Sequence, residues 1–158
     1  MLDLLLPRRL DNEYRGSRLA LWLFGLVIAM KSTQSLAIIF NGYSTASGAD
    51  GIPLDSFAPV VAQTVVALFA QGSLWRLFFC LLCGIVLVRY RSAVPLMFGL
   101  LTLNYLAAQL ILAFVPLPRV GAPIGPLVNL LLFALMLVGL GLSLWRRGGS
   151  VAPENRST

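Results

Sequence analysis

The chain has no histidine, and no acidic residue lies between Asp55 and Glu154. Without histidine it cannot form a Ser-His-Asp triad, a histidine-ligated zinc site or a haem site with the usual histidine ligand. Without carboxylates in that long stretch it lacks the Asp and Glu side chains that relay protons through membrane pumps. These absences exclude several common hydrolytic, metal-dependent and proton-pumping chemistries.

Cysteine is also scarce, with only Cys80 and Cys83 in 158 residues. Two thiolates alone cannot complete a structural zinc site or hold an iron–sulfur cluster. The sequence has no glycine-rich loop of the phosphate-binding kind. Charged residues make up 11% of the chain and hydrophobic residues 58%, which is too little charge to cover a water-facing surface. The composition therefore predicts an integral membrane protein.

Four apolar runs approach the roughly 20 residues that a helix needs to cross a bilayer. They cover residues 19–40, 73–88, 93–115 and 127–145. The connection between the second and third runs is short, so these two helices should be antiparallel neighbours. We therefore expect an all-α integral membrane protein, with one four-transmembrane-helix bundle over residues 19–145 and both termini on the same side.

Basic residues lie mostly on one side of this arrangement. Nine of the twelve flank the runs at that side: Arg8, Arg9, Arg15, Arg18, Arg89, Arg91, Arg146, Arg147 and Arg156. Lysine and arginine in short flanking segments are retained in the cytoplasm. We therefore expect a multi-pass protein of the bacterial inner membrane, whose basic N-terminal segment (1–18) and disordered tail (146–158) are cytoplasmic. The net charge of +6 does not indicate nucleic-acid binding, because these cations form no single groove or stripe.

The segment between the first two runs changes character. Residues 41–59 are rich in Gly, Ser, Asp and Pro and should form a long outer loop. Residues 56–71 are largely apolar with interspersed Gln and Thr, and Gly72 and Ser73 then offer a break. We predict a short amphipathic helix over 56–71 at the outer, periplasmic face. The alternative is one tilted helix that includes the second crossing, and helical reach does not separate the two.

Several polar side chains should lie at one depth in the bundle. Lys31, Arg76 and Asn104 are each thirteen positions from a flanking arginine. At ~1.5 Å per residue, each is about 20 Å from the inner boundary. Gln34, Gln109 and Asn129 fall slightly nearer the outside by the same count. All four predicted crossings therefore contribute to one polar layer.

A charge buried in lipid costs about 2.5 to 3.5 kcal/mol or more, so it usually faces a partner or a wet cavity. The candidate partners are Asp50, Asp55, the amides of Asn104 and Asn129, backbone carbonyls and a bound anion. The polar layer therefore predicts an outward-opening binding site for a lipid, a quinone or a small anion, and no other cofactor. In the alternative interpretation the cations extend toward the outer headgroups and the amides join helices.

Cys80 and Cys83 lie three residues apart and so share one helix face. With four predicted helices, this C-x-x-C spacing resembles the four-helix membrane thiol oxidoreductases, and the resemblance implies a redox role. Those enzymes need a second cysteine pair to pass electrons onward, and this chain has only two cysteines. Apolar surroundings also raise the pKa of a thiol and make it unreactive.

The architecture looks like that of the small polytopic proteins of bacterial inner membranes. We expect a non-enzymatic accessory or self-associating subunit whose outer polar layer binds the ligand. Its partners would be the lipid bilayer and either another membrane protein or a second copy of the chain. The alternatives are a thiol oxidoreductase and a small transporter, although no inverted repeat supports transport.

Overall fold

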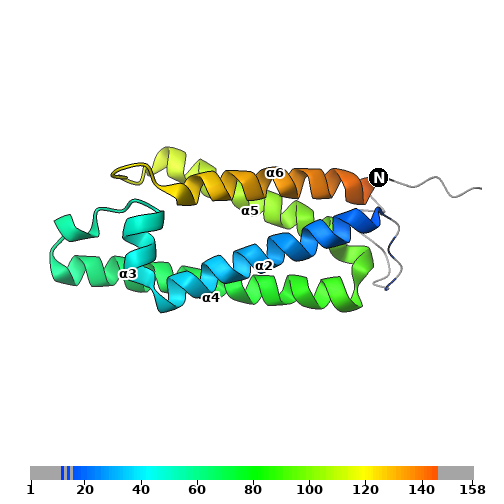
Figure 1. The fold of residues 1–158 in the computed structure, drawn as a ribbon, viewed down its shortest axis with the longest axis horizontal. Coiled ribbons are helices and arrows are strands. Elements are labelled where there is room, and N and C mark those ends of the chain that lie inside the picture. Colours follow the sequence, from blue (N-terminus) through cyan, green and yellow to red (C-terminus); the bar gives the residue numbers. More distant parts are fainter. Residues whose placement is uncertain (1–11, 13, 15, 146–158) are drawn as a thin grey trace, which may run out of the picture.

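The computed structural model describes residues 12, 14 and 16–145. Most of the predicted basic N-terminal segment and the whole predicted tail lie outside these residues. Every regular element in the described part is helical. Four helices are long and apolar enough to cross a membrane (Figure 1): α2 (Arg18–Phe40), α4 (Pro59–Arg89), α5 (Val94–Phe114) with the 3-10 turn η3 (Arg91–Ala93) before it, and α6 (Ile124–Leu144). The prediction of an all-α chain with four such helices is confirmed.

The boundaries of α2 and α5 follow the predicted apolar runs closely, whereas α4 and α6 begin earlier than predicted. Helix α6 begins at Ile124, three residues before the predicted run. Pro126 therefore lies in the first helical turn, where the missing N–H of proline removes no intrahelical hydrogen bond. The earlier start adds a turn at the end of α6 that faces the α5–α6 connection.

The prediction of a separate amphipathic helix over residues 56–71 is wrong. The structure instead agrees with the alternative of one helix that includes the second predicted crossing. The structure has one continuous helix, α4, of 31 residues. A glycine inside a helix costs only about 1 kcal/mol relative to alanine, and Ser73 beside Gly72 is buried within the bundle, so packing carries the helix through this pair. At ~1.5 Å per residue α4 is about 46 Å long. A helix of this length would cross a hydrocarbon layer of about 30 Å only if it tilted or extended beyond it.

Residues 41–58, which we name the cap segment, pack against the beginning of α4. They contain the short helix α3 (Gly42–Ser44), the π-helical turn η1 (Thr45–Ala49) and the 3-10 turn η2 (Leu54–Ser56). Ala46, Ile52 and Leu54 form a small apolar cluster with Ala62 of α4. The expected long loop is therefore a compact cap with a core of its own, formed because α4 extends far enough to supply one wall.

A backbone hydrogen bond joins the cap segment to the α5–α6 connection. Gly51 adopts a φ of 72°, a left-handed conformation that glycine takes without steric cost. Its carbonyl oxygen accepts a hydrogen bond from the Val120 N–H at 2.8 Å. A Cβ atom at Gly51 would lie 3.0 Å from the Val120 carbonyl oxygen, so glycine also permits this close approach.

The main apolar core lies toward the end of the bundle that carries η3. Its buried residues are Ala20, Phe24, Val27, Cys83, Val86, Ala93, Val94, Phe98, Leu101 and Met136. The rings of Phe24 and Phe98 meet edge to face, with centroids 4.8 Å apart. We call this the turn end of the bundle, and the opposite end, which carries the cap segment, the cap end.

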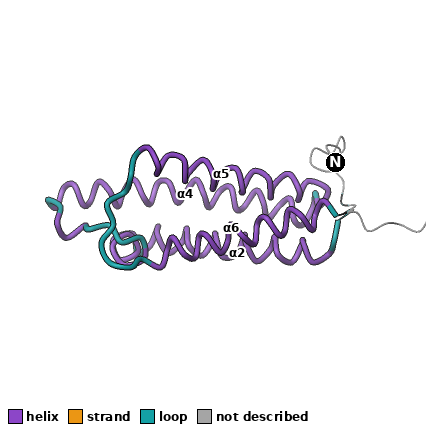
Figure 2. Tube along the Cα trace, turned by 90° about the horizontal axis from the view of Figure 1, so that it is seen from above, coloured by secondary structure: helices purple, strands orange, loops and turns teal. Residues whose placement is uncertain are grey.

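The four long helices do not close into a complete ring. Helix α2 packs against α4 and α6, and α6 packs against α5, whereas α4 and α5 make far less contact with each other. Figure 1 shows α4 and α5 joined at the turn end and diverging toward the cap end. Figure 2 shows the longer connections gathered at the cap end. The bundle is therefore open along one side, between α4 and α5.

Glycine at position 139 is expected to be essential for the contact between α5 and α6. A Cβ atom there would overlap the ring of Phe98, which is fully buried. Gly139→Ala should therefore lower the free energy of unfolding by about 1–3 kcal/mol, as overpacking of a core does. The measurement is unfolding by titration with a denaturing detergent in mixed micelles.

Gly141 provides the matched control on the same helix, because a Cβ atom there meets nothing within 4 Å. Gly141→Ala should leave stability unchanged or raise it slightly, since alanine is the better helix former. Equal effects of the two substitutions would contradict the proposed packing of Phe98 on α6.

Candidate functional site

A cavity of about 760 Å³ lies between the main core and the cap segment. This volume is within the usual range of small-molecule binding sites. All four long helices, the cap segment and the α5–α6 connection contribute to its wall. Its most polar lining residues are Lys31, Asp50, Arg76, Asn104, Gln109, Arg119 and Asn129.

The structure brings together five of the six residues predicted for the polar layer. Lys31, Arg76, Asn104, Gln109 and Asn129 all line this cavity, from four different helices. Matched depth on each helix, together with a face turned toward the bundle, explains why residues far apart in sequence meet. The geometry of the predicted layer is therefore present, and its ligand stays a hypothesis.

Gln34 is the predicted residue that does not line the cavity. It lies three positions after Lys31, which places it about 60° away around α2 and nearly a turn closer to the cap end. Its side-chain oxygen is buried and has no hydrogen-bond partner in the described part of the chain. Depth alone did not predict this, because the rotation of α2 between its two neighbours decides which side chains reach the opening.

Lys31 is held by an amide from another helix. Its ammonium group donates a hydrogen bond to the side-chain oxygen of Asn129 on α6, at 2.7 Å. Both side chains are only partly exposed, so the bond lies inside the bundle. Asn129 was one of the partners predicted for this cation, and that pairing is confirmed. The bond uses one of three ammonium donors and directs the charge inward.

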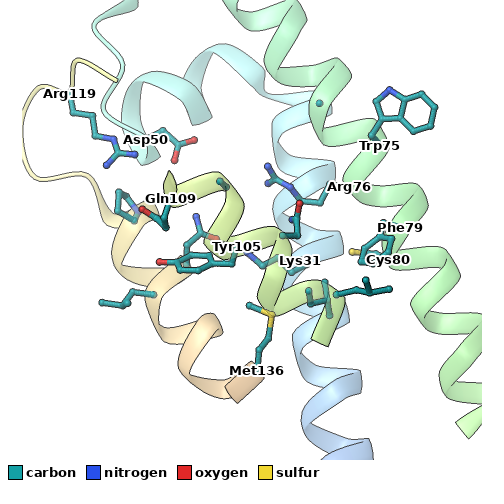
Figure 3. A pocket seen from close by; sticks show the side chains of 18 residues that line it. Lys31, Asp50, Trp75, Arg76, Phe79, Cys80, Tyr105, Gln109, Arg119 and Met136 are labelled. Atoms are coloured by element: carbon teal, nitrogen blue, oxygen red, sulfur yellow. Dashed lines mark hydrogen bonds between the residues drawn. The ribbon is translucent and has the colours of Figure 1, made fainter. Parts of the chain in front are cut away.

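Arg76 faces the same cavity from α4. Figure 3 shows its side chain pointing from α4 into the cavity that Lys31 also lines, whereas the neighbouring Trp75 points away. No described residue accepts a hydrogen bond from its guanidinium group. The charges of Arg76 and Lys31 are close enough to interact. Two like charges that face one cavity favour an anion between them.

The cap segment supplies the carboxylate of the site. Asp50 lines the cavity, whereas Asp55, the other predicted acidic partner, accepts a hydrogen bond from the Tyr43 hydroxyl within the cap segment. Desolvation raises the pKa of Asp50, and the positive charges of Arg119 and Arg76 oppose this shift. A Cβ atom at Gly125 would lie 2.6 Å from a carboxylate oxygen of Asp50, so glycine in the first turn of α6 makes room for it.

Arg119 and Tyr105 are lining residues that the sequence interpretation missed. Arg119 is the one cation of the α5–α6 connection, and Figure 3 shows it directed toward Asp50. Tyr105 stacks on Phe133 of α6, with ring centroids 4.5 Å apart. With Lys31 and Arg76, Arg119 brings the lining to three basic side chains against one carboxylate. The cavity therefore carries an excess of positive charge.

The two cysteines have different surroundings although they share a helix face. Cys80 lies at the cavity wall, and Cys83 is fully buried in the main core. Both are free thiols. Within the described residues no group of three or more His, Cys, Asp or Glu side chains could hold a metal ion. A buried apolar site favours a packing role for Cys83, and the redox alternative stays a prediction.

Comparison with protein-family models, with curated proteins and with solved structures gave no match. The function is therefore inferred from the fold and from the chemistry of the cavity.

The bond between Lys31 and Asn129 is expected to couple α2 to α6. Asn129→Leu should lower the free energy of unfolding by about 1–3 kcal/mol, because it leaves a partly buried ammonium group without its acceptor. In a Lys31→Met background the same change should cost much less, since no charge is then left unpaired. A double-mutant cycle in mixed micelles measures this coupling.

Asn104 provides the control for this cycle, because it lines the same cavity and lies on α5. Asn104→Leu should show no coupling to Lys31→Met. Additive effects of the Lys31 and Asn129 substitutions would show that their hydrogen bond contributes nothing to stability.

Proposed function

We propose that the chain is a multi-pass protein of the bacterial inner membrane, with the cap segment outside and both termini in the cytoplasm. Four sufficiently long apolar helices support the crossing. The Ser17 N–H donates to the Leu142 carbonyl oxygen at 3.3 Å, which keeps the start of α2 beside the end of α6. Arg89 and Arg91 lie at the same turn end, where the rule for positive charges predicts the cytoplasm.

We further propose that the protein is a non-enzymatic, ligand-binding accessory or self-associating subunit, and that its ligand carries negative charge. The observation that supports this is the convergence of Lys31 and Arg76 on one cavity with excess positive charge. A quinone head is uncharged and would leave that charge uncompensated. An anionic group would form charge-assisted hydrogen bonds with the guanidinium and ammonium donors. Anionic ligands are therefore favoured over quinones.

Three features favour binding over the alternatives. Lys31 donates inward to Asn129, whereas a cation that only extends toward the headgroups would point along the helix toward the cap end. The main apolar core fills the bundle between the cavity and the turn end, which favours a binding site blocked at that end over a transport path through the bundle. The cavity wall also has a single carboxylate among its polar side chains, and no histidine exists to act as a base.

The test of this proposal removes the Arg76 charge. Arg76→Gln should reduce the retention of an anionic ligand about tenfold or more, because a hydrogen bond to a charged group contributes about 1.5–3 kcal/mol. Two probes are offered separately to the purified full chain: phosphatidylglycerol, and inorganic phosphate. Native mass spectrometry measures the bound fraction, and it also reports copies of the chain or a partner protein.

Arg89→Gln is the matched control, because Arg89 ends the same helix and does not line the cavity. It should retain the ligand like the wild type, as should Cys80→Ala combined with Cys83→Ala. If the wild-type chain retains neither phosphatidylglycerol nor inorganic phosphate, the proposed function is disproved. A loss of binding in the double cysteine variant, with Arg76→Gln unaffected, would favour the thiol-dependent alternative.

Asp50 should make anion binding depend on pH. Below its raised pKa the carboxyl group is neutral, and the cavity gains one net positive charge; above that pKa the carboxylate competes with the ligand for Arg119 and Arg76. Affinity for phosphatidylglycerol should therefore rise as the pH falls through this pKa. Asp50→Asn should raise the affinity at neutral pH about fivefold, for an interaction of about 1 kcal/mol, and should remove this rise in affinity toward acidic pH. An unchanged pH profile in Asp50→Asn would contradict this role.

A further inference from the structure

The cavity is amphipathic along the axis of the bundle. Its charged side chains, including Asp50 and Arg119, lie toward the cap end or at the level of Arg76. Toward the turn end its wall becomes apolar, and includes Phe79, Leu100, Leu101 and Met136. A small soluble anion would use only the polar part. A ligand that fills the whole cavity needs a charged head and an apolar body.

The cavity also lies at the open side of the bundle. Helices α4 and α5 diverge toward the cap end, and both contribute exposed residues to the wall. On α4 these include Gly72 and Arg76, and on α5 they include Leu100 and Ala108. In a membrane, a gap between two apolar helices faces acyl chains, so an amphiphile can enter from the side.

From this polarity we infer that the ligand is a phosphate-bearing lipid. Its phosphate binds at Arg76 and Lys31, and a chain lies along the apolar wall and leaves between α4 and α5. This inference rests on the proposed function and narrows it to one class of ligand. The direction of the cavity fits a lipid of the leaflet whose headgroups lie at the cap end, because the head then points to the cap and the chain points to the membrane centre.

The charge of such a lipid also matches the site. A phosphodiester carries one negative charge and several acceptor oxygens, and the cavity offers three basic side chains against the one carboxylate of Asp50. Guanidinium groups bind phosphate through paired donors, and the Arg76 donors are not used by any described residue. A zwitterionic phosphatidylcholine head would bring its own positive charge into this site and should bind less well.

The test places a large ring where the lipid chain should lie. Leu100→Trp fills the apolar part of the cavity, whereas Leu103→Trp, on the same helix and 61% exposed, does not line it. A second pair tests the cap-end side of the entrance between α4 and α5: Ala108→Trp changes a lining residue, and Ala107→Trp changes its neighbour, which does not line the cavity. All four variants are purified as the full chain, and circular dichroism checks their helix content.

Native mass spectrometry then measures retention of phosphatidylglycerol, phosphatidylcholine and inorganic phosphate. We expect the wild type, Leu103→Trp and Ala107→Trp to prefer phosphatidylglycerol. Leu100→Trp and Ala108→Trp should lose it about fivefold or more, which corresponds to about 1 kcal/mol.

The other possible outcomes distinguish the lipid inference from the proposed function of anion binding. Equal retention of phosphatidylglycerol in both members of each pair would overturn the placement of the chain between α4 and α5. Retention of inorganic phosphate without phosphatidylglycerol would overturn the lipid inference and leave the proposed anion binding intact. Retention of neither probe would overturn the proposed function together with this inference.

Discussion

Two positive charges on long apolar helices that carry no carboxylate are the constraint on which this structure depends. Lys31 and Arg76 come from different helices and face the same space. Between Asp55 and Glu154 no acidic side chain is available to neutralise them. If these helices cross a membrane, compensation must come from an amide, from the cap segment or from a ligand, because an unpaired charge in an apolar medium is costly. The cavity provides room for all three.

The two ends of the bundle contain separate apolar clusters. At the turn end, apolar residues from all four helices form a dry core around Phe24 and Phe98. At the cap end, α4 extends far enough for Ala62 to join a second apolar cluster with the cap segment. The polar cavity lies between these two clusters. Its charges therefore do not interrupt either core, and the bundle keeps its stability while retaining an open, polar middle.

Much of the fold could be predicted from apolar run length, since each run of suitable length became a helix. The continuity of α4 could not, because Gly72 and Ser73 are local signals and the packing that overrides them is tertiary. Depth along each helix predicted that Lys31, Arg76 and Asn104 meet. It misplaced Gln34, because rotation about the axis is set by neighbouring helices.

The loop contributions to the site were harder to predict from the sequence. Arg119 lies in a proline-rich connection without periodicity, so no helical count gives its position. It reaches the cavity because the Val120 N–H is bonded to the Gly51 carbonyl oxygen of the cap segment. That bond also fixes one end of the gap between α4 and α5, and the short turn η3 fixes the other. An opening held at both ends keeps its width before a ligand arrives, and a preformed site loses less conformational entropy on binding.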